Sequence, residues 1–139
     1  MQKYWINVIP KDRVLKAVEE GIMQSQGDEA HLSRIQKDDM VVFYSPREDS
    51  EGTKKLQTFT AVGQIADEEI YPVQGAVVKA FRRKINYTEC QEISVIPLIQ
   101  NLHFIRNKKH WGFVFKQSLI QILQPDFETI TNGMVEKVL

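Results

Sequence analysis

Two short segments of the sequence combine aromatic rings with polar side chains, where an ordinary buried strand would carry only aliphatic residues. The residues concerned are Tyr4, Trp5, Asn7, Tyr44, Ser45 and Arg47. Such a set suits a flat ligand with hydrogen-bonding edges, because rings stack on its face while amides, hydroxyls and guanidinium groups contact its edge. The commoner place for large aromatic rings is a hydrophobic core. The sequence leaves open whether Trp5 lines a pocket or lies beneath one.

Basic residues are grouped twice along the chain, each time beside an aromatic ring. The first group surrounds Phe81 and the second precedes Trp111; they comprise Lys79, Arg82, Arg83 and Lys84, then Arg106, Lys108, Lys109 and His110. This pattern is typical of nucleic-acid binding, since cations contact phosphates and rings stack on bases. The alternative is a solvated surface whose rings point inward. If the fold brings both groups to one end, they would form a local basic face.

Composition limits the partners that the whole molecule can attract. The 139 residues include 18 basic and 18 acidic side chains, so no net field draws the protein to nucleic acid. The length fits one domain over residues 1–139. No segment approaches the roughly 20 apolar residues of a membrane helix, and the N-terminus does not resemble a signal peptide. We therefore predict a cytoplasmic protein that makes no membrane contact; the sequence carries no signal for an oligomeric state.

The sequence offers no recognisable catalytic or metal-binding constellation. Its single cysteine, Cys90, excludes an internal disulfide and a multi-cysteine metal site. The three histidines lack metal-ligand spacing, and no glycine-rich phosphate loop occurs. No nucleophile, base and oxyanion donor can be assembled from named residues. We predict a non-catalytic protein without a metal or cofactor.

The hydrophobic pattern predicts several strands with short helices near the start and the end of the chain. Strands are expected at 3–9, 40–45, 57–65 and 80–87, and helices at 10–20, 32–35 and from about 126. Residues 21–30 are expected to form a loop, and Pro46 to end the second strand. Gly63 inside a strand predicts a bulge or a close backbone approach. These elements indicate a mixed α+β domain with a curved sheet or small barrel.

Six segments occur in an order that resembles the EVE domain family, in particular its small stand-alone branch. They are Tyr4–Val8, Val42–Arg47, Phe59–Gly63, Phe81–Arg83, Pro97–Ile99 and Phe104–Gly112. The resemblance extends from about residue 3 to residue 130. It implies a PUA-like fold, in which a strongly bent, mostly antiparallel sheet forms a pseudo-barrel with short flanking helices. It also places the chain near YTH, ASCH and PUA domains, which bind RNA or modified bases.

The resemblance further implies a binding site for a flipped, modified base in DNA or RNA, with methylated cytosine or adenine as candidates. The implied ligand-binding residues are Trp5, Asn7, Ser25, Tyr44, Ser45, Arg47, Tyr87 and Trp111. The implied contacts to the nucleic-acid backbone are Arg82, Arg83, Arg106, Lys108 and Lys109. An aromatic residue that YTH relatives place in the loop after the first helix has no counterpart here. Two alternatives remain: an RNA-binding accessory to RNA modification or translation, and an enzyme that uses the same pocket on a nucleotide or other small molecule.

Overall fold

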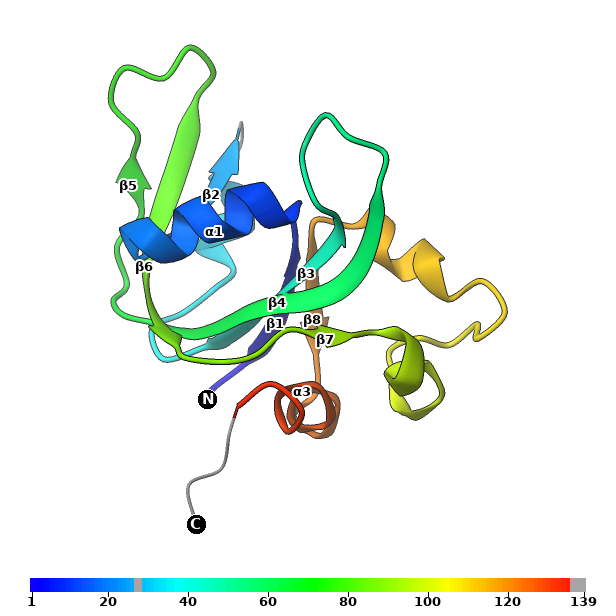
Figure 1. Cartoon of the computed structure of the whole chain (residues 1–139). Coiled ribbons are helices and arrows are strands. Elements are labelled where there is room, and N and C mark those ends of the chain that lie inside the picture. Colours follow the sequence, from blue (N-terminus) through cyan, green and yellow to red (C-terminus); the bar gives the residue numbers. More distant parts are fainter. Residues whose placement is uncertain (27–28, 136–139) are drawn as a thin grey trace.

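One curled sheet organises the protein, as the computed structural model shows for residues 1–26 and 29–135 (Figure 1). The strands are β1 (Tyr4–Val8), β2 (Ile22–Gln26), β3 (Met40–Arg47), β4 (Lys55–Ile65), β5 (Tyr71–Pro72), β6 (Ala80–Thr88), β7 (Ile93–Ser94) and β8 (Leu119–Ile122). The helices are α1 (Lys11–Glu20), α2 (Ala30–Ser33), α3 (Gln124–Thr131) and the 3₁₀ turns η1 (Ile96–Asn101) and η2 (Trp111–Lys116). The expected bent sheet with short flanking helices is confirmed.

The main path of the sheet runs β2-β6-β4-β3-β1-β8, and β5 and β7 pair with β6 and β4 respectively. Between these described strands, every pairing is antiparallel except β1 with β3, which is parallel. A parallel pair needs a crossover connection. Here α1, β2 and α2 form that crossover, and they build one side of the site described below.

Local sequence signals account for α1. Pro10 precedes its first turn, where a missing N–H has no cost. Gly21 ends it with a left-handed φ of 67°, and the Gly21 N–H bonds to the carbonyls of Ala17 and Val18. Val14 and Ala17 are buried against the sheet. The predicted helix is therefore confirmed at both ends.

Two predictions about strand boundaries are wrong. Residues 22–26 form β2 instead of a loop, because the edge of β6 supplies a distant hydrogen-bonding partner that the polar local sequence does not reveal. Pro46 lies within β3 instead of ending it. The ladder between β3 and β4 is irregular from Ser45 to Arg47, so Pro46 occupies a position where the missing N–H is tolerated.

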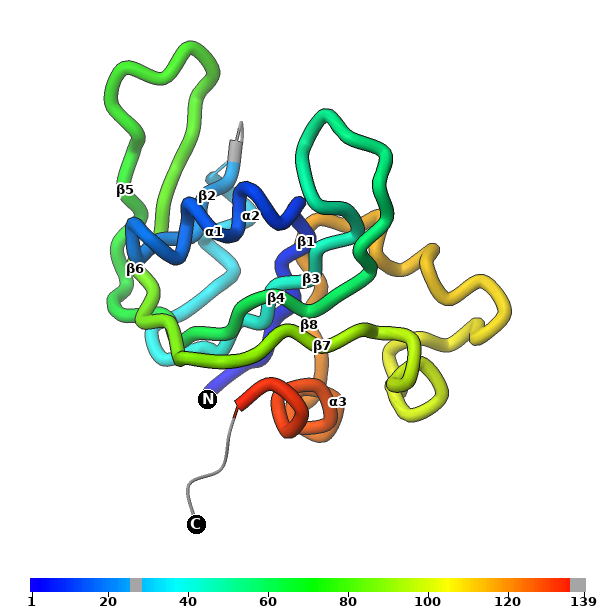
Figure 2. The backbone as a smooth tube through the Cα atoms, in the orientation of Figure 1, coloured from blue at the N-terminus to red at the C-terminus, as the bar shows by residue number. Residues whose placement is uncertain are grey.

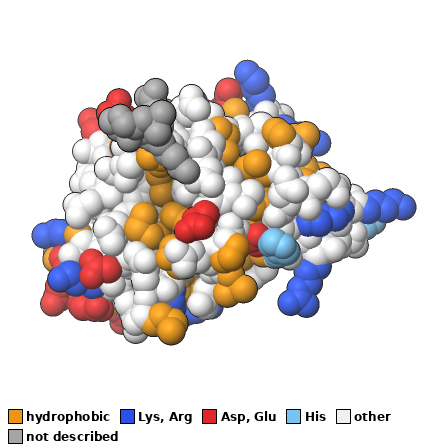
Figure 3. All heavy atoms as spheres, turned by 90° about the horizontal axis from the view of Figure 1, so that it is seen from below, with side chains coloured by type: hydrophobic (Ala, Val, Ile, Leu, Met, Phe, Trp, Pro, Cys, Tyr) orange, Lys and Arg blue, Asp and Glu red, His pale blue; other side chains and the backbone are white. Residues whose placement is uncertain are grey.

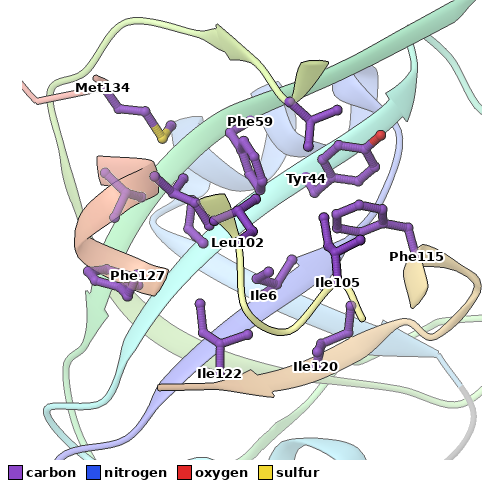
Figure 4. Packing of buried hydrophobic residues seen from close by; sticks show 14 of the residues in the cluster. Ile6, Tyr44, Phe59, Leu102, Ile105, Phe115, Ile120, Ile122, Phe127 and Met134 are labelled. Carbon is purple, nitrogen blue, oxygen red and sulfur yellow. The ribbon is translucent and has the colours of Figure 1, made fainter. Parts of the chain in front are cut away.

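The two faces of the sheet carry separate core clusters, and a register shift between β3 and β4 changes which β4 residues join each of them. Phe43 pairs with Ala61 but Tyr44 pairs with Phe59, so Thr60 is an extra residue in β4. Trp5 and Phe43 lie in the cluster beneath α1, whereas Tyr44 and Phe59 lie in the cluster beneath α3 (Figure 4). The two helices therefore cover opposite sides of the curled sheet (Figure 2).

Gly63 confirms the close approach expected at its position. A Cβ added there would lie 2.8 Å from the carbonyl oxygen of Asn86 and 2.8 Å from a side-chain carbon of Ile85. The absence of a side chain lets β6 pair closely with β4 at this point, after its first half has paired with β2. Among the described residues, no helix is long and apolar enough to cross a bilayer.

Candidate functional site

A cavity of about 240 Å³ lies where β1 and β2 approach α2 and the first residues of β8. Its walls are Asn7, Val8, Ile9, Arg13, Met23, Gln24, Ser25, His31, Leu32, Ser118 and Leu119. Pockets that enclose drug-sized ligands occupy about 300–1,000 Å³. The size of this cavity therefore suits a smaller ligand of one or two rings.

Asn7 presents a side-chain amide to this cavity. Alternation along β1 places Trp5 and Asn7 on the face that bears α1, while Ile6 faces the other cluster. Asn7 is only 6% exposed, and among the described residues its side-chain amide has no hydrogen-bond partner. The Oδ1 and Nδ2 atoms of Asn7 keep some contact with solvent at the cavity, so they are open to a ligand without the penalty of fully buried, unpaired groups. Asn7 is therefore prepared to donate to and accept from a ligand.

The remaining walls divide into an apolar floor and a polar edge. Met23, Leu32 and Leu119 are buried and supply the floor. On the edge, the half-buried Ser25 contributes a hydroxyl group. His31 also lies there, with its Nδ1 3.5 Å from Ser118 Oγ, at the outer limit of a hydrogen bond. This arrangement can grip a flat apolar body and read hydrogen-bonding groups at its rim.

A second cavity of about 260 Å³ adjoins the first and shares Ile9, Arg13 and Gln24 with it. Its distinguishing feature is three cationic side chains, which are Arg13, Lys16 and Arg82. Arg82 is held in place, since its Nε donates to Gln24 Oε1 at 2.8 Å and its Nη2 lies 3.4 Å from Glu20 Oε2. These three cations outnumber the single carboxylate of Glu20. The second cavity therefore suits an anionic group of a ligand whose ring occupies the first cavity.

The predicted aromatic residues lie beneath or away from the cavity. Trp5 is buried, and its Nε1 donates to the buried Asp39 Oδ2 at 2.9 Å. Tyr44 is buried and stacks on Phe115, with ring centroids 3.9 Å apart (Figure 4). Tyr87 donates its hydroxyl to the carbonyl of Ile22 at 2.7 Å. The structure places Trp5 under the pocket, in the same cluster as Met23 and Leu32.

Three further predicted ligand residues are also outside the cavity walls. Ser45 is fully buried, with its hydroxyl 2.9 Å from that of Thr60. Arg47 is exposed at the end of β3. Trp111 lines a separate cavity of about 220 Å³ around η2, together with Phe104 and Phe113. Of the predicted ligand set, the structure brings Asn7 and Ser25 together.

The two basic groups do not merge into one face. Arg83 is 1% exposed and donates to the carbonyls of Leu32, Ile35 and Asp67, so it supports the fold instead of facing solvent. Lys108 is likewise occupied, since its Nζ lies 2.9 Å from Ile99 O and 2.6 Å from Leu102 O.

Arg82 lines the second cavity, beside α1, whereas Arg106 and Lys109 are exposed near η2. Figure 3 shows Lys and Arg side chains gathered at the end of the molecule where the loops around η2 project. The basic residues therefore form two surfaces, one at the cavities and one around η2.

A model of the EVE domain matches residues 3–133 of the chain. The chain belongs to the EVE domain family. A UPF0310 protein of Bacillus licheniformis is 41% identical over 128 residues, covering 91% of this chain and 87% of that protein. A UPF0310 protein of Mycolicibacterium vanbaalenii is 35% identical over 133 residues, covering 94% and 92%.

Solved structures resemble this EVE domain at much lower identity. The ZmASCH mutant protein of Zymomonas mobilis superposes with a TM-score of 0.60 at 10% identity, covering 96% of this chain and all of that one (100%). Rpa0253 of Rhodopseudomonas palustris gives 0.59 at 12% identity, covering 94% and 92%. These similarities establish an ASCH-like, PUA-like fold.

Several residues of the EVE domain site were not selected from the sequence. Arg13 and Lys16 are three residues apart on α1, a spacing that places both on one helix face and that the sequence did contain. His31 and Ser118 carry no such signal, because they meet only through the fold. Within the described part of the chain, no group of three or more His, Cys, Asp or Glu residues could hold a metal ion.

Burial of two tyrosines in this EVE domain predicts sensitivity to alkaline pH. Desolvation raises the pKa of both Tyr44 and Tyr87 above the ordinary value of about 10. Both phenols stay neutral in the folded protein while the unfolded chain ionises. The stability is therefore complete below pH 10 and falls as the pH rises above it, by about 1.4 kcal/mol per pH unit for each tyrosine.

Tyr44→Phe should match the pH dependence of the wild type below pH 9 and lose less stability above pH 10. Urea unfolding at a series of pH values measures this difference. Equal alkaline losses in the two proteins would show that Tyr44 does not contribute.

Proposed function

We propose that this EVE domain binds nucleic acid and accepts one extruded base in the 240 Å³ cavity. The observation that carries the proposal is the amide of Asn7, a residue only 6% exposed that has no partner among the described residues and lines a cavity with an apolar floor. An amide can donate to and accept from the edge of a base at the same time. A base that has left its stack offers such an edge and a flat apolar face.

A methyl group on the base would improve the fit to the apolar floor. Met23, Leu32 and Leu119 offer aliphatic and thioether surface, and a thioether interacts favourably with an aromatic ring. Burying one methyl group contributes about 0.8 kcal/mol. Methylated cytosine or adenine is therefore the proposed ligand class. Since no Phe, Tyr or Trp ring lines this cavity among the described residues, we expect modest affinity.

The cations of the adjoining cavity would hold the phosphates on either side of the extruded nucleotide. Arg13 lines both cavities, and Lys16 and Arg82 extend the positive surface away from Asn7. Such contacts set the register of the strand and make the affinity depend on salt. The specificity would then rest on Asn7 and Ser25, and the affinity largely on the cations.

Binding to a matched panel of oligonucleotides tests the proposal. The panel contains DNA and RNA with cytosine, methylcytosine, hydroxymethylcytosine, adenine or N6-methyladenine at one position, measured at two salt concentrations. We expect one modified base to be preferred. Asn7→Ala should lower the affinity for that oligonucleotide about tenfold or more, as expected when a buried hydrogen-bonding group loses its partner.

Asn86→Ala is the matched control, because Asn86 is an exposed strand asparagine outside the cavity walls. It should bind like the wild type. Equal affinity of the wild-type protein for all modified and unmodified bases would refute modified-base recognition. An Asn7→Ala variant that folds and keeps the preference would refute the assigned cavity.

A further inference from the structure

The β5–β6 hairpin carries two apolar side chains that are largely exposed to solvent. The hairpin loop is closed by a hydrogen bond from Val73 N to Ala80 O at 2.9 Å. At its tip, Val77 is 104% exposed and Val78 is 59% exposed. Adjacent aliphatic residues at the tip of a projecting loop are unfavourable in water. Their position therefore suggests a surface that is covered on binding.

The strand pairing places the base of this loop beside the β2 wall of the 240 Å³ cavity. Ser25 pairs with Phe81, and Gln26, the last residue of β2, pairs with Ala80. The loop therefore begins where the β2 wall of the cavity ends. Figure 1 shows the hairpin rising beyond the C-terminal end of α1, next to β2, which supplies Gln24 and Ser25 to the cavity.

The charges along the hairpin favour a polyanionic partner. No Asp or Glu occurs from Tyr71 to Thr88, and Lys79 directly follows the two valines. Arg82, on the same strand, lines the cationic cavity. A nucleic-acid duplex matches both the cations and the exposed valines of this hairpin. Its phosphates are anionic, and they surround an apolar stack of bases.

We propose that Val77 and Val78 enter the base stack at the position that the extruded base vacates, so that the ligand is a duplex. This inference rests on the proposed function, since it assigns the nucleic acid that delivers a base to the cavity. Proteins that deform duplexes insert apolar side chains between base steps in this way. Filling the gap would offset part of the unstacking cost of a few kcal/mol.

A duplex with a single abasic site tests the hairpin independently of the base cavity. This probe has a gap in its stack but no base that could enter the cavity at that position. We expect the wild-type protein to bind it about tenfold more tightly than the intact duplex of the same sequence, because no base need be unstacked. The double variant Val77→Ser/Val78→Ser should lose this preference, while Ala76→Ser, in the same loop, should keep it.

The base-cavity variant separates this inference from the proposed function. Asn7→Ala should keep the preference for the abasic duplex, although it loses recognition of the modified base. The inference is overturned if the wild type does not distinguish the two duplexes, or if the double serine variant still does. It is also overturned if the valines instead mediate self-association, seen as an oligomer by ultracentrifugation that the double variant abolishes.

Discussion

Arg83→Met is expected to lower the free energy of unfolding by about 3–5 kcal/mol, because buried carbonyls that lose a donor cost about 1–3 kcal/mol each. The guanidinium is 1% exposed and donates to carbonyls from two separate segments, Leu32 and Ile35 near α2 and Asp67 after β4. Burial lowers the pKa of Arg83, although the nearby acidic residues Glu68, Asp67 and Asp39 oppose that shift. Methionine preserves much of the side-chain volume but leaves three carbonyls without this donor.

Arg82→Met is the matched control, since Arg82 is the neighbouring residue and is partly exposed. Its contacts are with Glu20 and Gln24 near the surface, so its loss should cost at most about 1 kcal/mol. Urea unfolding of both variants at neutral pH provides the comparison. If both variants unfold with similar free energies, Arg83 does not act as the structural support described here.

The second large effect concerns salt. Replacing Arg13 and Lys16 together by glutamine should weaken binding to the preferred oligonucleotide by about tenfold or more at low salt. It should also reduce the slope of log K against log salt concentration by about 1.4–1.8, that is, by 0.7–0.9 for each phosphate that is no longer neutralised. Arg13 lines the cavity of Asn7 and the adjoining cavity, Lys16 lines the adjoining one, and both lie on one face of α1. Because both are exposed, the fold should keep its stability.

Arg106→Gln/Lys109→Gln is the informative comparison, because these exposed cations lie around η2 and outside both α1 cavities. We expect this pair to change the salt slope by less than half as much. A larger change than that produced by the α1 pair would assign the backbone contacts to η2 instead. Titrations at four or more salt concentrations distinguish the two results.

The parts of the fold that local sequence controls could be predicted. Pro10 and Gly21 bound α1, and Gly63 marks the close approach of two strands. β2 could not be predicted in this way, because its polar residues form a strand only where β6 provides the partner. The face of Phe59 depends in turn on the extra residue Thr60, because the register shift puts Phe59 and Ala61 of β4 in different clusters.

The site was predictable to a smaller extent. Asn7 and Ser25 lie in the cavity, but whether a ring such as Trp5 faces the ligand or the core is decided by tertiary packing. The burial of Arg83 could have been predicted from the sequence pattern of β6. Alternation along β6 puts it on the same face as Phe81, Ile85 and Tyr87, which all pack in the cluster beneath α1.

The cavity combines residues that are synthesised far apart in time. Asn7 and Ser25 come from the first strands, whereas Ser118 and Leu119 come from the start of β8 and complete the opposite wall. At about 5–20 residues per second, the two parts of the cavity leave the ribosome roughly 5–20 seconds apart. A nascent chain that has not reached β8 has Asn7 and Ser25 but lacks Ser118 and Leu119 on the opposite wall. The proposed base site is therefore complete only when translation is nearly finished.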